Sequence, residues 1–168
     1  MDLYPKEVMK HFKNPQNVGK IKNPSGIGKV GNLRCGDIMY LYLKIGKKGK
    51  KEIIEDVKFE TFGCTVAIAN TSLLTTMAKG KTVEQAMKIT KDNLLKKFGK
   101  IPFIKIHCSM LAVDALAEAI YDYFKKEGRE IPKELELKHQ AAEKIGEELK
   151  ERHKDLLAIE EKLHKENE

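Results

Sequence analysis

The sequence predicts a mixed α/β fold of the α+β type, in which helices flank an antiparallel sheet and a further helix follows at the C-terminal end. Three observations predict it. Two runs of alternating apolar and polar residues lie on either side of a lysine- and glycine-rich stretch at 44–51. Apolar residues then recur at helical spacing over 109–126, and at heptad spacing beyond Pro132.

The two alternating runs predict a hairpin. The first run has two faces, with Met39, Leu41, Leu43 and Ile45 on one and Tyr40 and Tyr42 on the other. The second run covers 53–62, and the stretch at 44–51 supplies the turn between them. The lysines of this turn have no aromatic residues among them for base stacking. We therefore expect a solvated turn, and this argues against nucleic acid as a partner.

Local signals predict the helices. The expected helices cover 5–13, 65–78, a segment opened by Thr82, a turn between Thr90 and Gly99, and 109–126. Thr82 and Gln85 have the spacing of a capping box, in which two side chains satisfy the free N–H groups of the first helical turn. Gly80 and Gly128 follow two of these segments and are typical stop signals.

Length and composition indicate one globular domain. The chain has 168 residues, of which 41% are apolar, enough to bury a core. No apolar run approaches the length of a membrane span, and the first residues lack the apolar stretch of a signal peptide. We therefore expect a cytoplasmic protein with no membrane partner, in which thiols stay reduced.

The last part of the chain has a different character. We expect a globular domain over 1–130 and a charged helical extension over 131–168. Apolar residues of the extension follow one another at spacings of three and four, the pattern of a single helical face: Ala142, Ile145, Leu149, Leu156, Ile159 and Leu163. This face can dock back onto the domain, or it can serve self-association into a homo-oligomer or the binding of a partner.

Gly26, Gly28 and Gly31 match the spacing of a dinucleotide-binding fingerprint. That fingerprint requires a strand before it and a helix after it, whereas here a loop precedes it and a predicted strand follows. We therefore expect these glycines to let a loop bend next to Cys35.

The three cysteines of the chain lie in three different local sequences: Cys35-Gly36-Asp37, Phe62-Gly63-Cys64 and Lys105-Ile106-His107-Cys108-Ser109. Thiolate, imidazole and carboxylate groups together form a ligand set for a soft or borderline metal. An antiparallel hairpin brings the start of its first strand beside the end of its second. Cys35, Asp37 and Cys64 are therefore expected to be neighbours, whereas His107 and Cys108 can reach them only through helix packing.

Helix starts favour the ionised thiol. Cys64 precedes one predicted helix and Cys108 lies at the start of another, where free N–H groups stabilise thiolate. The alternative is that each cysteine is a small buried apolar residue. A structural zinc site usually brings its ligands in close pairs, which this chain lacks. Single ligands far apart in sequence indicate a site that can open, which suits a metal or cluster that is delivered and removed.

At these residues the chain resembles the scaffold proteins of iron–sulfur cluster assembly, the IscU/NifU N-terminal family. The three cysteine-containing segments resemble the ligand motifs of the family, and His11-Phe12-Lys13-Asn14-Pro15-Gln16-Asn17 resembles its opening. The resemblance covers about residues 3–127. The chain resembles the related Suf-type scaffolds less closely. They resemble it less at His107, and they carry an insertion that this chain lacks.

This resemblance implies a three-stranded antiparallel sheet, with the third strand near 27–33. It implies a scaffold without enzymatic turnover that builds a transient [2Fe–2S] cluster and passes it to acceptor proteins. The implied ligands are Cys35, Cys64 and Cys108, with Asp37 or His107 as the fourth. Iron is the metal of this cluster, and zinc is a possible occupant of the same site.

The resemblance also implies partners. Sulfur would arrive as persulfide from a cysteine desulfurase, with Cys108 as the acceptor and Lys105 assisting ligand exchange. The segment Ile101-Pro102-Phe103-Ile104-Lys105 lacks the second proline of the family's chaperone-recognition motif, which argues against docking to the dedicated Hsp70-type chaperone.

Two other functions use the same residues. One is a zinc-binding structural or regulatory module. The other is a cysteine-dependent enzyme with Cys108 as nucleophile and His107 as base, but adjacent side chains at a helix start usually point apart.

Overall fold

The computed structural model describes residues 4–33, 35–152 and 154. Its elements in chain order are α1 (Lys6–Lys13), β1 (Gly26–Gly31), β2 (Ile38–Lys48), β3 (Lys51–Phe62), α2 (Thr65–Ala78), α3 (Val83–Ala86), α4 (Lys91–Phe98), the 3₁₀ turn η1 (Phe103–Lys105), α5 (His107–Lys126) and α6 (Lys133–Arg152). None of the helices in the described part of the chain combines the length and apolarity that a bilayer crossing requires.

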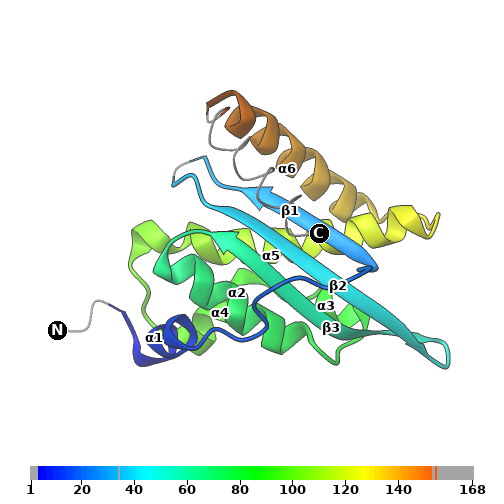
Figure 1. The fold of residues 1–168 in the computed structure, drawn as a ribbon, viewed down its shortest axis with the longest axis horizontal. Helices are drawn as coiled ribbons and strands as arrows, with labels where there is room; N and C mark the ends of the chain where they lie inside the picture. Colours follow the sequence, from blue (N-terminus) through cyan, green and yellow to red (C-terminus); the bar gives the residue numbers. More distant parts are fainter. Residues whose placement is uncertain (1–3, 34, 153, 155–168) are drawn as a thin grey trace.

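The sheet is antiparallel and has the strand order β1-β2-β3 (Figure 1). In the predicted hairpin Ile38 pairs with Phe62 at one end, and Lys48 pairs with Lys51 at the turn. The lysines of the turn are exposed, as predicted. β1 adds the third strand in the region where the family resemblance implied one. The mixed fold expected from the sequence is therefore confirmed.

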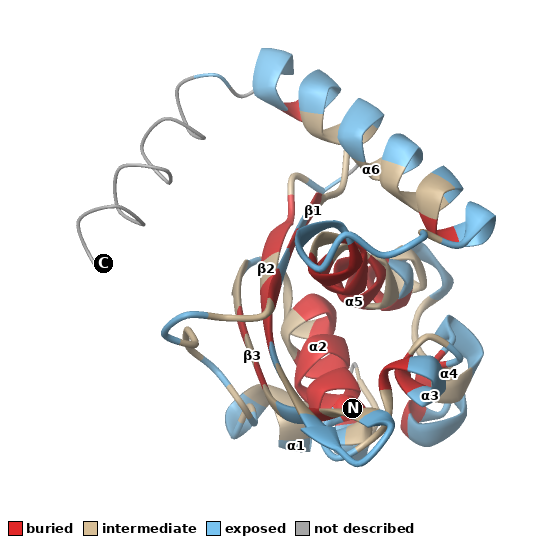
Figure 2. Ribbon diagram, turned by 90° about the vertical axis from the view of Figure 1, so that its right-hand side faces the viewer, coloured by how far each residue is buried: buried red, intermediate tan, exposed pale blue. Residues whose placement is uncertain are grey.

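Helices α2 and α5 cover one face of this sheet, and the buried residues gather between the two layers (Figure 2). The alternating face of β2 predicted from the sequence supplies Met39, Leu41 and Leu43, each fully buried. Many residues of α2 have small side chains, and most residues of this helix are buried. This allows it to lie deep in the core, where its N-terminal end meets that of α5.

The helix starts predicted from local capping signals are present in the structure. Thr82 and Gln85 form a capping box at α3, and Thr90 forms another with Asn93 at α4. α5 begins at His107, two residues before the predicted start, because the turn η1 leads directly into it. Cys108 is thus the second residue of the helix and already lies inside its first turn.

The expectation that the glycines bend a loop is wrong. Gly26, Gly28 and Gly31 lie within β1, and their role is close packing. A Cβ atom on Gly28 would lie 2.1 Å from the backbone oxygen of Ala115, and one on Gly26 equally close to that of Ala119. β1 therefore rests directly on the backbone of α5, an approach that any larger residue would prevent.

The C-terminal helix α6 packs back onto α5 and β1 (Figures 1 and 2). Leu135 and Leu149, near its two ends, are buried, and Ala142 packs against the core between them. Docking onto the domain is therefore the arrangement of the described part of the extension. The predicted heptad positions Leu156, Ile159 and Leu163 lie outside the described residues.

Candidate metal centre

The hairpin places Asp37 beside Cys64. Asp37 directly precedes β2 and Gly63 directly follows β3, so the pairing of the two strands brings them together. A Cβ atom on Gly63 would lie 3.3 Å from the carboxyl carbon of Asp37, which shows how closely the chain passes. Cys64 is the N-cap residue of α2, and its thiol is half-buried.

Helix packing brings Cys108 to the same place. The Sγ atoms of Cys64 and Cys108 are 3.5 Å apart, and the Sγ atom of Cys108 lies 4.0 Å from Oδ2 of Asp37. One ligand atom from each of these residues lies within 4.8 Å of the others. Within the described part of the chain, this is the one group of at least three acidic, cysteine or histidine side chains so arranged.

The two thiols have opposite acidities. A hydrogen bond from Cys108, with help from backbone N–H groups of Val66 and Ala67 at the start of α2, lowers the pKa of Cys64 to about 6. The same hydrogen bond, followed by burial, raises the pKa of Cys108 above its ordinary value. At neutral pH the pair therefore holds one negative charge, located on the more exposed sulfur.

The negative charge of Cys64 affects the pKa of Lys105. The thiolate of Cys64 is the largest cause that raises the pKa of the Lys105 ammonium group, and Cys108 and Asp37 add to it. Lys105 is the last residue of η1, close before α5. The site thus combines two thiols, one carboxylate and a nearby cation.

Cys35 lies outside this group. It is exposed on the loop between β1 and β2, where its N–H donates to Oδ1 of Asn32 at 3.4 Å. Partial burial of the thiol is the largest cause that raises its pKa; a backbone contact at Asp37 acts in the opposite direction, and the Asp37 carboxylate raises the pKa further. The sequence argument placed Cys35, Asp37 and Cys64 together. The structure joins Asp37 and Cys64 closely. The Cys35 thiol also interacts with the Asp37 carboxylate, but it is not among the ligand atoms that lie within 4.8 Å of one another.

His107 also lies outside the group. It is the first residue of α5, and its Nε2 atom is buried without a hydrogen-bond partner. Among the residues that the structure describes, the Cys108 thiol makes its hydrogen-bond contacts with Cys64 and Asp37 and not with His107. This geometry does not support His107 as a base for a nucleophilic Cys108.

Sequence reasoning missed the polar contact that fixes the two helix starts. The buried hydroxyl of Ser109 donates to Oδ1 of Asn70 at 3.0 Å, while Nδ2 of Asn70 donates to the carbonyl of Val66 at 2.9 Å. These bonds tie the first turn of α5 to the first turn of α2. An asparagine inside an Ala/Ser/Thr-rich helix was the available signal, because a buried amide needs partners.

Residues 3–130 match the family model described as the NifU-like N-terminal domain. The chain belongs to this family. Several curated relatives are named as scaffolds. The chain is 51% identical over 127 residues to "Iron-sulfur cluster assembly scaffold protein IscU 1" of Archaeoglobus fulgidus, which covers 76% of this chain and 80% of that protein. It is 43% identical over 126 residues to "Iron-sulfur cluster assembly scaffold protein IscU" of Aquifex aeolicus, with 75% and 79% covered.

Solved structures show the same fold. A candidate iron–sulfur cluster assembly scaffold for the SUF system from Fervidobacterium islandicum AW-1 superposes with a TM-score of 0.58 at 25% identity, covering 70% of this chain and 96% of that one. A NifU-like N-terminal protein from Brucella abortus gives 0.56 at 19% identity over 72% and 94% of the two chains. The NifU-like match ends before α6, so this helix lies outside the part shared with the family model.

Proposed function

We propose that this chain is a scaffold on which an iron–sulfur cluster is assembled and from which it is passed to acceptor proteins. The observation that carries the proposal is the convergence of Asp37, Cys64 and Cys108 from three separate segments within 4.8 Å. Thiolates bind iron and hold sulfide, and a site with few protein ligands permits release. Membership of a family whose relatives are named as such scaffolds supports it.

We propose a [2Fe–2S] cluster held by Cys35, Cys64 and Cys108, with Asp37 or His107 as the fourth ligand. Asp37 already lies in the group, and its carboxylate is a hard oxygen ligand, which exchanges more readily than thiolate on this cluster. His107 offers a buried Nε2 atom without a partner. Cys35 is not among the ligand atoms within 4.8 Å, so we propose that it moves toward Cys64 and Cys108 when the set is completed.

Sulfur delivery follows from the acidities of the two inner thiols. We propose that a cysteine desulfurase supplies sulfur as persulfide and that it ends on Cys108. The half-exposed Cys64 thiolate is the sulfur that a partner can reach first. Transfer to Cys108 across 3.5 Å moves the outer sulfur from one cysteine to the other. The Cys108 sulfur attacks the outer sulfur of the Cys64 persulfide anion, the Cys108 proton passes to that outer sulfur, and Cys64 leaves as thiolate. The Lys105 cation stabilises that leaving charge.

The role is one of binding and delivery, without turnover of its own, and we expect it in the cytoplasm, where thiols stay reduced. The acceptors would be proteins whose acidic surfaces fit the basic body of this chain, which has a net charge of +7 overall.

A zinc-binding structural module would use the same ligands and is the second candidate. Both use Cys64 and Cys108, so the metal content after reconstitution decides between them.

The test is anaerobic reconstitution of the full chain with ferrous iron, cysteine and a catalytic amount of a cysteine desulfurase. We expect visible absorbance and acid-labile sulfide in the wild-type protein, and neither in Cys64→Ser or Cys108→Ser. Met110→Ala is the matched control, because this exposed residue of α5 is close in sequence but not a ligand. A colourless protein that holds only stoichiometric zinc contradicts the scaffold and supports the zinc module.

A further inference from the structure

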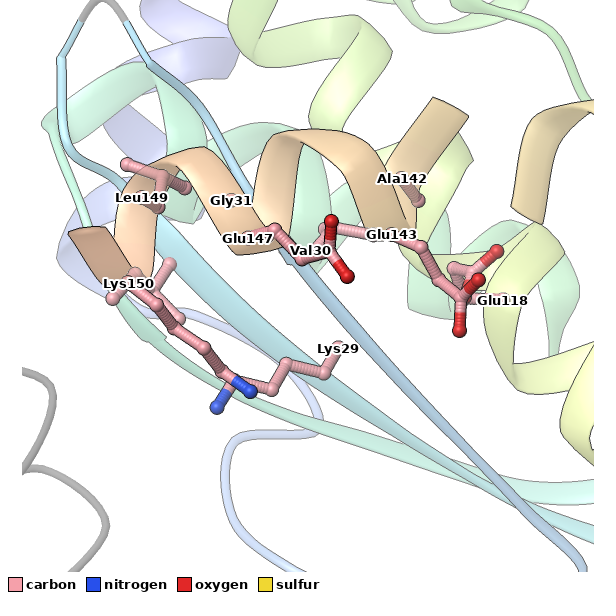
Figure 3. A pocket seen from close by; sticks show the side chains of 11 residues that line it. Lys29, Val30, Gly31, Glu118, Ala142, Glu143, Glu147, Leu149 and Lys150 are labelled. Atoms are coloured by element: carbon pink, nitrogen blue, oxygen red, sulfur yellow. The ribbon is translucent and has the colours of Figure 1, made fainter. Parts of the chain in front are cut away.

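The C-terminal end of α6 contacts the strand that leads to Cys35. The Leu149 side chain is buried, and its Cδ1 atom lies 2.2 Å from the point where a Cβ atom on Gly31 would be (Figure 3). A leucine methyl group thus fills the space that the glycine leaves free. Gly31 is the last residue of β1, and the loop with Cys35 and Asp37 begins directly after it.

A second contact lies two residues further along this loop. Nη1 of Arg152 donates to the carbonyl oxygen of Leu33 at 3.2 Å. Between the two contacts lies Asn32, which closes the loop: its N–H donates to the carbonyl of Asp37, and its own carbonyl accepts from Gly36, both at 2.9 Å. Leu149 and Arg152 therefore hold the base of the loop on both sides of its closing residue.

The rest of α6 is anchored away from this loop. The His139 ring stacks on Tyr121 of α5 with 3.7 Å between ring centres, and its Nδ1 lies 2.9 Å from a carboxylate oxygen of Glu118. A pocket of about 230 Å³ separates the middle of α6 from β1, with Leu149 and Gly31 among its lining residues (Figure 3). The packing of α6 against β1 is therefore uneven along the helix. The close contact is that of Leu149 with Gly31, where the loop begins.

We propose that α6 is a strap that positions the loop carrying Cys35 and Asp37, with Leu149 and Arg152 as its positioning residues. By holding the base of the loop it slows the opening through which a bound metal or cluster leaves. This inference rests on the proposed function for what is retained, but the strap itself is a property of the metal-free protein. Because α6 lies outside the part matched by the family model, the strap belongs to the extension of this chain.

The first test measures amide hydrogen exchange by NMR in the metal-free full chain. Loss of the strap exposes the hydrogen bonds of the Asn32 and Gly36 amides through local opening, so Leu149→Ala should speed their exchange by about tenfold, and Arg152→Ala by a smaller factor. Leu137→Ala is the matched control, an exposed leucine on the same helix. Unchanged exchange at both amides in Leu149→Ala and Arg152→Ala overturns the strap. Arg152 is exposed and gives up one hydrogen bond, so this variant stays folded.

A rescue experiment separates the strap from general destabilisation. Gly31→Ala places a methyl group against Cδ1 of Leu149 and should displace the end of α6, again speeding exchange at Asn32 and Gly36. Adding Leu149→Ala removes the clash, so the double variant should exchange no faster than Leu149→Ala alone. Independent, multiplying effects of the two substitutions would contradict direct contact.

Retention is measured with Zn²⁺ as the probe. After loading, the protein is mixed with excess chelator and the rate of Zn²⁺ loss is recorded. We expect a several-fold faster loss in Leu149→Ala and Arg152→Ala, and no change in Leu137→Ala. Equal rates in all four proteins overturn the role in retention. If exchange changes as expected but no cluster assembles in the reconstitution, the proposed function fails and the strap stands.

Discussion

The Sγ atoms of Cys64 and Cys108 lie 3.5 Å apart, although 44 residues separate them in the chain. Each belongs to the start of a helix, and the two helix starts are tied together by the buried Asn70–Ser109 hydrogen bond. The contact makes the two thiols one acid–base unit in which Cys108 keeps the proton and Cys64 carries the charge. This asymmetry underlies the direction in which we propose that sulfur moves.

The acidity of Cys64 is directly measurable. In the metal-free protein, alkylation of Cys64 should follow a midpoint near pH 6, instead of the pKa of 9.0 of an ordinary thiol. Mass spectrometry of the peptide after timed alkylation at each pH gives this profile. Because the hydrogen bond from Cys108 is the largest cause, Cys108→Ala should move the midpoint upward. A wild-type midpoint near pH 9 would contradict the shared proton.

The same shifts predict how stability depends on pH. Between pH 6 and 9 Cys64 is ionised in the folded protein and protonated in the unfolded chain, so its contribution to the free energy of unfolding grows with pH and is lost as pH falls through 6. The raised pKa of Cys108 acts in the opposite sense above pH 9, where only the unfolded thiol ionises. Urea unfolding of wild type and of the Cys64→Ala, Cys108→Ala double variant should differ in this pattern. If the free energies of unfolding of the two proteins changed with pH in the same way over this range, the prediction would be contradicted.

Asp37 is predicted to govern release. Replacing it with alanine removes the oxygen ligand that we propose to be labile. The cluster should then survive several-fold longer in air, measured by the decay of visible absorbance. Asp56→Ala is the control, an aspartate of β3 that pairs with Lys79. Faster loss of the cluster in Asp37→Ala than in the control would show that this carboxylate retains the cluster instead of releasing it.

The approach of β1 to α5 predicts a specific sensitivity. Gly28→Ala would place its methyl group 2.1 Å from the backbone oxygen of Ala115, and such overpacking should lower the free energy of unfolding by about 1–3 kcal/mol. Gly146→Ala in α6 meets no atom within 4 Å and should be neutral, or stabilising by about 0.5–1 kcal/mol. Urea denaturation measures both. If the two variants had equal free energies of unfolding, β1 would be able to move away from α5 without a loss of stability.

We propose that residues 1–130 form the scaffold unit and 131–168 an appended helical segment, which predicts the effect of truncation after Glu130. Cluster assembly should persist, judged by the same absorbance, because Asp37, Cys64 and Cys108 all lie in the retained part. Thermal stability should fall, since each of the buried residues Leu135 and Leu149 contributes about 1.5–3 kcal/mol. A truncated protein that stays folded but assembles no cluster would show that α6 belongs to the unit.

Much of the fold could be predicted because its signals are local. The hairpin follows from alternation on both sides of a turn, and the helix starts follow from Thr82 and Thr90, whose capping partners lie three residues away. The pairing of Ile38 with Phe62 then places Asp37 beside Cys64 without further information. These are the parts of the site that neighbouring residues determine.

The remainder depends on packing between distant elements. Cys108 reaches the site only because α5 lies against α2, and the contact between Asn70 and Ser109 that fixes this has no local pattern. The glycines of β1 were misinterpreted for the same reason: the backbone of α5 that they approach is about ninety residues away in the chain, since Gly28 meets Ala115. The place of Cys35 depends on loop geometry, including a positive φ of 70° at Gly36, which periodicity does not indicate.

The central claim is that the chain assembles a cluster and gives it up. The most direct measurement is transfer: the wild-type protein is reconstituted with ³⁵S-labelled cysteine and desulfurase, separated from both, and mixed with an apo-ferredoxin under anaerobic conditions. We predict that labelled sulfide and visible absorbance leave this protein and appear together on the ferredoxin. Label that stays on this protein, or a ferredoxin that remains apo while the scaffold loses its colour, would contradict the account.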